Sequence, residues 1–281
     1  MPGRERREIE EVAAVRDHDR VVTPAVRFGF LVPLALGCGW VGVVLTFRTQ
    51  AGWAVGSPLS AATIGACYLG GMAALAVAAE QRRWLDVRTP VLASLILLGL
   101  SVGVIWLHRN EFPIVWFAVH AVLLVAGLAV LVWQLNPSRA FAKQSPFETG
   151  RKERAQWWIA APVASVALIG TLLGLAVLLA PQRIEPYWPW AASPLDLRMT
   201  GVWILALGAG SWFALAEGDP ARWRAGAAGC VVAGLLALLA LVTHPGEVRW
   251  DHLPSRIYAG LMLALAVEGT AAWIRATRRT R

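Results

Sequence analysis

The 281-residue sequence is poor in charged residues, which make up only 16% of the chain, whereas an ordinary soluble domain has about 25%. Lysine is almost missing: it occurs only as Lys143 and Lys152, so 24 of the 26 basic residues are arginine. The three cysteines, Cys38, Cys67 and Cys230, all lie inside apolar runs. The scarcity of charge excludes a water-soluble globule, and the positions of the cysteines exclude a disulfide framework or a zinc site.

The sequence also lacks the short motifs that mark common chemistry. It has no Walker loop, no dinucleotide-binding glycine fingerprint, no nucleophile elbow and no zinc-protease helix motif. We therefore expect neither a cofactor nor a metal ion, and the sequence favours a protein that is not an enzyme.

Long apolar runs account for most of the chain, and hydrophobic residues reach 57%. A helix needs about 20 mostly apolar residues to cross a bilayer. We predict an all-α integral membrane protein with eight transmembrane helices. The predicted spans are 28–47, 59–79, 91–107, 113–135, 157–180, 199–216, 225–243 and 257–274.

The basic residues are distributed unevenly between the two sides of these spans. Alternating loops and the two termini place 20 basic residues on one side, and the other side has only Arg48, Arg109, Arg183, Arg198, Arg249 and Arg256. Because cytoplasmic loops are rich in Lys and Arg, we predict a multi-pass protein of the plasma (inner) membrane with both termini in the cytoplasm. Topology thus explains the net charge of +8, and we expect the lipid bilayer rather than nucleic acid as the partner.

The two halves of the chain share a series of short matches, which indicates an internal duplication. The interval from the matched serine to the matched glutamate is 54 residues in each half, 57–111 and 193–247. We predict two tandem four-helix repeats in parallel orientation. The matches are Ser57-Pro58-Leu59 with Ser193-Pro194-Leu195, Gly65 with Gly201, Ala79-Glu80 with Ala216-Glu217, Arg83-Trp84 with Arg222-Trp223, and His108-x-x-Glu111 with His244-x-x-Glu247.

The predicted organisation has five parts. Residues 1–27 form a cytoplasmic tail, 28–135 the first four-span unit, 136–156 a cytoplasmic linker, 157–274 the second four-span unit, and 275–281 a basic cytoplasmic tail. The linker is rich in Pro, Ser and basic residues, as flexible connections are.

The second unit carries the residues of a wider resemblance. Trp188-Pro189-Trp190 precedes Ser193-Pro194-Leu195, then Gly201-Val202-Trp203 and Glu217, and finally His244, Glu247 and Trp250. In this pattern the chain resembles a group of multi-span membrane proteins of high-GC bacteria that have no assigned activity. The resemblance implies a fold type and a membrane location, and it carries over no catalytic residue.

Polar residues at the predicted outer ends of the spans are the first candidate site. Asp196 and Arg198 follow the Ser193-Pro194 helix start and could bind an anion or a lipid headgroup, or simply form an interfacial pair with a snorkelling Arg. His108 with Glu111, and His244 with Glu247, are three residues apart and could share a helix face. Such pairs could relay protons or bind a metal, but a His at a helix C-terminus and a solvated Glu explain them as well.

His120 and Glu268 are the only ionisable residues inside the predicted spans, which makes each a functional candidate by default. They could belong to a polar pathway or to a structural hydrogen bond between helices. Trp188 and Trp190 could stack a flat ligand, or they could form a rigid elbow at the membrane interface.

Three function classes follow from these patterns. The duplication and the outer polar cluster favour a non-enzymatic, transporter-like or binding protein for a small molecule, lipid or ion. The lack of repeated buried charges is also compatible with an accessory or assembly subunit, whose partner would be another membrane protein or a second copy of this chain. A membrane enzyme acting on a lipid-linked substrate, with His244, Glu247, Asp196 or Arg198 in acid-base or phosphate-binding roles, is the third alternative.

Overall fold

The computed structural model describes residues 22–47, 53–135 and 157–278. This part of the chain is all-helical and contains no strand. Eight of its helices are long and apolar enough to cross a membrane, which indicates a multi-pass membrane protein. The long helices are α3 (Val32–Phe47), α4 (Pro58–Glu80), α5 (Trp84–Leu107), α6 (Ile114–Leu135), α7 (Trp157–Leu179), α9 (Pro194–Glu217), α10 (Arg224–Thr243) and α11 (Leu253–Arg278).

Short helical turns extend or connect these helices. The first span starts at α2 (Pro24–Val26) and reaches α3 through a π-helical turn, η1 (Arg27–Leu31). Pro33 follows this turn, and its missing N–H interrupts the regular α-helical hydrogen bonds. The remaining short elements are α8 (Pro181–Ile184), η2 (Glu185–Tyr187) and η3 (Pro220–Trp223).

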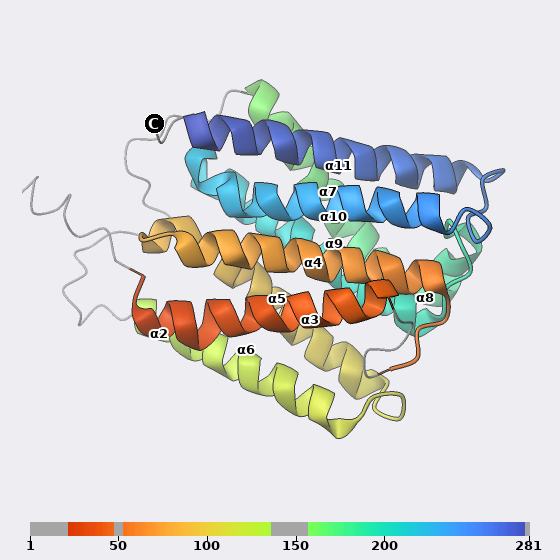
Figure 1. The fold of residues 1–281 in the computed structure, drawn as a ribbon, viewed down its shortest axis with the longest axis horizontal. Coiled ribbons are helices and arrows are strands. Elements are labelled where there is room, and N and C mark those ends of the chain that lie inside the picture. Colours follow the sequence, from red (N-terminus) through yellow and green to blue (C-terminus); the bar gives the residue numbers. More distant parts are fainter. Residues whose placement is uncertain (1–21, 48–52, 136–156, 279–281) are drawn as a thin grey trace, which may run out of the picture.

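The eight helices form two layers of four. Layer one contains α11, α10, α4 and α3, and layer two contains α7, α9, α5 and α6, each in order of neighbouring helices. In Figure 1 layer one runs from α11 at the top to α3, with the fainter α7, α9 and α5 behind it and α6 at the lower edge. Each layer therefore combines two helices from each half of the chain, so the halves interleave.

The two ends of the helix assembly differ in character. We call one end the Ser-Pro end, because Ser57-Pro58 and Ser193-Pro194 begin helices there, and the opposite end the arginine end. In Figure 1 the Ser-Pro end lies on the right and the arginine end on the left.

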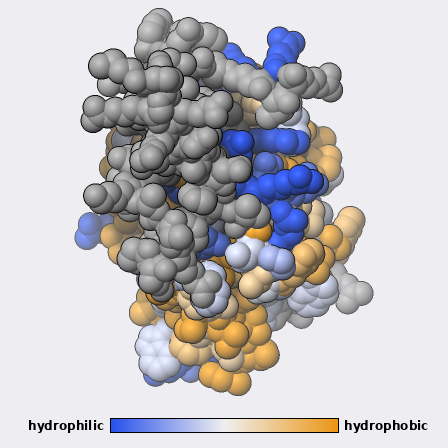
Figure 2. Space-filling view, turned by 90° about the vertical axis from the view of Figure 1, so that its left-hand side faces the viewer, coloured by the Kyte–Doolittle hydropathy of each residue, from blue (hydrophilic) through white to orange (hydrophobic). Residues whose placement is uncertain are grey.

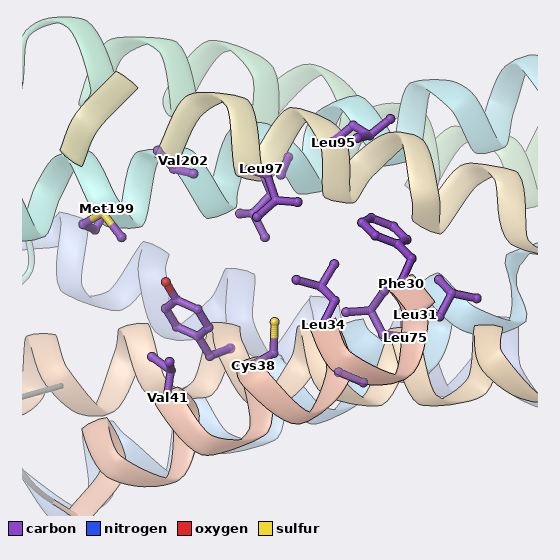
Figure 3. Packing of buried hydrophobic residues seen from close by; sticks show 14 of the residues in the cluster. Phe30, Leu31, Leu34, Cys38, Val41, Leu75, Leu95, Leu97, Met199 and Val202 are labelled. Carbon is purple, nitrogen blue, oxygen red and sulfur yellow. The ribbon is translucent and has the colours of Figure 1, made fainter. Parts of the chain in front are cut away.

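Buried apolar side chains and glycines hold the helices together. Phe30, Leu34 and Leu95 belong to a cluster of buried residues between the layers, shown in Figure 3. Tyr68 of α4 meets Trp203 of α9 edge to face, with ring centroids 4.8 Å apart. Small residues such as glycine allow close helix approach where lipid supplies no hydrophobic driving force between helices. On the outside of the assembly, α6 and α7 expose valine and leucine side chains.

The predicted helices are confirmed, but several of their ends are corrected. Helix α5 begins at Trp84 instead of residue 91, and α9 begins at Pro194 instead of residue 199. Helix α11 covers Leu253–Arg278, so it extends beyond both ends of the predicted span and into the predicted C-terminal tail. The predicted spans end where polar residues begin, but polar residues fit in the first turn of a helix when caps or partners satisfy them.

Candidate functional site

The N-termini of helices α4 and α9 lie at the Ser-Pro end, and each is capped by a serine. The Ser57 hydroxyl accepts a hydrogen bond from the Ser60 N–H at 3.0 Å, and the Ser193 hydroxyl accepts one from the Asp196 N–H at 3.1 Å. Each serine is followed by a proline at the first helical position, where the missing proline N–H costs no intrahelical bond. These caps set where the following charged residues of α9 lie.

Asp196 connects the two halves of the chain. Its Oδ2 atom accepts hydrogen bonds from the Ser193 N–H at 3.3 Å and from the Gly56 N–H at 2.9 Å. The residue is only 1% exposed, and its Oδ1 atom has no hydrogen-bond partner among the residues that the structure describes. A Cβ atom at Gly56 would lie 2.8 Å from Oδ2, so glycine is required there for the carboxylate to approach the backbone.

Glu247 makes a second contact between the halves. Its Oε2 atom accepts a hydrogen bond from the Leu59 N–H at 3.1 Å. Leu59 lies in the first turn of α4, where backbone N–H groups lack intrahelical acceptors and negative charge is stabilising. Two carboxylates of the second half therefore bind the N-terminus of a first-half helix.

Arg198, His108 and Glu111 form a hydrogen-bonded chain at the same end. Arg198 Nη1 lies 2.7 Å from His108 Nε2, and His108 Nδ1 lies 2.7 Å from Glu111 Oε1. Arginine can only donate, so Nε2 accepts, the imidazole is neutral, and Nδ1–H donates to Glu111. The arrangement places an imidazole with a defined tautomer between a guanidinium and a carboxylate.

The corresponding pair in the second half, His244 and Glu247, does not form. His244 Nδ1 instead lies 3.1 Å from the Ala240 carbonyl oxygen and 3.0 Å from the Thr243 hydroxyl. Helix α10 ends at Thr243, and residues 245–247 form a turn. Helix α5 likewise ends at Leu107, and residues 108–111 form a turn. Neither pair therefore shares a helix face, and His108 and Glu111 make their contact within a turn.

The structure does not bring His120 and Glu268 together. His120 is buried and its Nδ1 lies 2.8 Å from the Trp116 carbonyl oxygen, within α6. Helix α6 packs against α5, whereas α11, which carries Glu268, packs against α10. Figure 1 places α6 and α11 at opposite edges of the assembly, so these two residues form no common pathway.

Trp188 and Trp190 are enclosed by the protein. Both are buried, and the Trp190 indole N–H donates to the Ser60 hydroxyl at 2.8 Å. Trp190 also meets Tyr258 of α11 edge to face at 5.2 Å. The aromatic segment therefore acts as an internal elbow that joins three helices, and its rings do not offer a face to a flat ligand.

A buried ion pair that the sequence patterns did not indicate lies near the arginine end. Arg88 Nε of α5 donates to Glu217 Oε1 of α9, and the Thr89 hydroxyl donates to the same oxygen at 2.9 Å. Arg88 is 7% exposed and Glu217 3%. The predicted spans contain no Asp, Glu, Lys, Arg or His other than His120 and Glu268, but the helices extend beyond those spans, and Arg88, Asp196, Arg198 and Glu217 also lie in them.

Several other described arginines lie at the arginine end, among them Arg27, Arg222 and Arg224. Figure 2 views this end, where hydrophilic residues lie beside a hydrophobic surface. Arg222 pairs with Asp219 at 3.3 Å, Arg224 lies over the Trp273 ring at 4.9 Å, and Arg27 donates to the Gln81 carbonyl oxygen at 2.9 Å. These three arginines thus have partners within the protein.

Among the residues that the structure describes, no three His, Cys, Asp or Glu side chains are grouped as they would be around a metal ion. No family model, curated protein or solved structure matches this chain. The site at the Ser-Pro end must therefore be interpreted from its own chemistry, which combines a guanidinium donor, a neutral imidazole and three carboxylates.

Proposed function

We propose that this protein binds a small molecule, lipid or ion at its Ser-Pro end, as a carrier or binding protein and not as an enzyme. One observation carries the proposal: charged side chains of the second half meet polar groups of the first half there, through the contacts Asp196–Gly56, Glu247–Leu59 and Arg198–His108. Ionisable groups are costly at the level of a bilayer and commonly mark ligand or ion sites. A binding site between the two halves can also change its shape when the halves move relative to each other, as a carrier requires.

The helix arrangement supports the proposed duplication. Exchanging α3, α4, α5 and α6 with α7, α9, α10 and α11 converts one layer into the other, and every principal helix pair maps onto another principal pair. Matched glycines make matched close approaches: a Cβ atom at Gly65 would lie 3.0 Å from the Gly42 carbonyl oxygen, and one at Gly201 would lie 3.2 Å from that of Gly174. Both observations are expected of parallel repeats related by an axis along the membrane normal.

The proposed setting is a bacterial plasma membrane with the arginine end in the cytoplasm, in keeping with the bias of basic residues. The predicted 136–156 linker lies outside the described residues. A Ser145→Cys variant tests the orientation through labelling with a membrane-impermeant thiol reagent. No labelling of intact cells but labelling after lysis supports the orientation, and labelling of intact cells contradicts it.

An accessory-subunit function is the second candidate, because Asp196 and Glu247 bind backbone N–H groups as structural braces would. Native mass spectrometry of the full chain, purified from its native membrane in mild detergent, separates the two candidates. The ligand proposal expects a retained small molecule or lipid that is lost in Asp196→Asn and Glu247→Gln but kept in Asp219→Asn, at the opposite end. A stoichiometric protein partner without a retained ligand would favour the accessory function.

A further inference from the structure

Arg198 has partners that leave its charge without a direct counter-ion. Nη1 donates to the neutral imidazole of His108, and Nε donates to the Leu178 carbonyl oxygen at 3.4 Å. Among the described residues no carboxylate lies within ion-pair distance of Arg198, although Asp196 is two residues away. The Asp196 carboxylate instead binds Gly56 and Ser193.

The guanidinium also has unused donors. Arginine carries five N–H groups in a planar fork, and the two contacts use one on Nε and one on Nη1. The remaining N–H groups on Nη1 and Nη2 match the spacing of two oxygens on a phosphate or carboxylate. Arg198 is partly exposed, so this side of the fork can be reached.

We infer that Arg198 forms a binding site for a phosphate or carboxylate group, at the junction of α9, the end of α7 and the end of α5. This inference rests on the proposed function and names its ligand class. The anion completes the charge pair that the protein leaves open, and His108 holds the guanidinium in place without neutralising it.

Glu111 orients the imidazole of His108 and is not itself the counter-ion of Arg198. Its carboxylate lies on the far side of the imidazole from Arg198, and its side chain is 54% exposed. Solvent therefore screens its repulsion of an anion, while its hydrogen bond fixes the imidazole tautomer that accepts from Arg198.

The duplication makes the stoichiometry specific. The position that matches Arg198 in the first half is Ala62, and the position that matches Asp196 is Ser60. The first half thus lacks the guanidinium, and one anion is expected to bind per chain.

The test uses the full chain in mild detergent with two probes, inorganic phosphate and phosphatidylglycerol mixed with phosphatidylcholine. Native mass spectrometry counts bound lipids, and equilibrium dialysis measures phosphate. The matched control is Arg256→Gln, because Arg256 lies at the same end and its Nε also donates to a carbonyl oxygen, that of Trp250 at 3.3 Å. We expect one anion bound by the wild type and by Arg256→Gln, and at least tenfold weaker binding by Arg198→Gln.

The two probes distinguish the source of the anion. Retention of one phosphatidylglycerol that phosphate does not displace identifies a lipid headgroup, whereas phosphate binding that excludes the lipid identifies a free anion. If Arg198→Gln does not fold, Arg198→Lys keeps the charge but loses the fork, and it is expected to bind about tenfold more weakly. Wild-type binding by these Arg198 variants, or no binding of either probe by the wild type, overturns the inference.

The inference can fail while the proposed function stands. A retained molecule that is lost in Asp196→Asn and Glu247→Gln but kept in Arg198→Gln would support a binding site at the Ser-Pro end. It would also show that Arg198 does not bind this molecule as an anion. Absence of any retained small molecule or lipid would reject both.

Discussion

Arg88 and Glu217 show how strongly one residue pair can connect the two halves. Both side chains are buried, and Thr89 donates a further hydrogen bond to the same carboxylate. A buried ion pair contributes little net stability relative to an apolar pair of the same size, but removing one partner leaves an uncompensated charge. The cost of substitution should therefore depend on whether the partner is still present.

We predict that Arg88→Met or Glu217→Leu alone lowers the free energy of unfolding by about 3–5 kcal/mol. The double variant Arg88→Met/Glu217→Leu should recover most of this loss, because no unpaired charge remains. Thermal unfolding of the three variants in one detergent measures the difference. Losses that simply add in the double variant would contradict the buried pair.

Gly56 is a second residue whose identity is set by contact between the halves. Gly56→Ala would place a Cβ atom 2.8 Å from Asp196 Oδ2 and push the carboxylate away from the Gly56 N–H. We expect a loss of about 1–3 kcal/mol from this overpacking. Gly246→Ala is the control at the same end, because a Cβ atom there meets nothing within 4 Å. Equal unfolding temperatures of the two variants would reject the expectation.

At the scale of helices, close packing depends on glycines at particular faces. In Gly65→Ala the new Cβ atom would lie 2.8 Å from Thr46 Oγ1, and in Gly201→Ala it would lie 3.0 Å from the Leu178 backbone nitrogen. Both variants should lose about 1–3 kcal/mol, because the α3–α4 and α7–α9 pairs must separate. Gly99→Ala in α5 has open space and should be neutral or slightly stabilising. Unfolding curves in detergent compare the three.

The positions of the helices could be predicted from sequence because length and apolarity alone decide which segments can span a bilayer. Their ends could not. The polar residues Arg88 and Asp196 lie inside helices because Glu217 and Gly56, which are distant in sequence, satisfy them. Hydropathy describes each segment separately, so it carries no information about such partners.

Only the local contacts of the candidate site could be predicted from the sequence, because partners distant in sequence leave no local pattern. The spacing of His108 and Glu111 correctly indicated a contact, although the two residues meet in the turn that follows α5 and not on a helix face. The identical spacing of His244 and Glu247 did not give one, since His244 contacts the Ala240 carbonyl oxygen and Glu247 accepts from the Leu59 N–H of the first half. The contact between Arg198 and His108 joins residues 90 positions apart, and no local pattern indicates it.

On the scale of the whole molecule, the interleaved layers predict that neither half is a complete folding unit. Separate expression of residues 1–145 and 146–281 should give two fragments that are degraded or aggregate when expressed alone. Co-expression should restore a complex, because α4 packs on α10 and α5 on α9. Affinity purification through a tag on one fragment, followed by detection of the other, measures reassembly. A stable, monodisperse single fragment would contradict the prediction.

The interleaving also has a consequence for synthesis. When the ribosome has released α3 to α6, each layer holds only two of its four helices, and the faces of α4 and α5 that later receive α10 and α9 are still in contact with lipid. At about 5–20 residues per second, the second half takes on the order of ten seconds to follow. During that interval the nascent first half is an open assembly, and the last helix of layer one, α11, is also the last to leave the ribosome. The order of translation thus makes layer one the last to close.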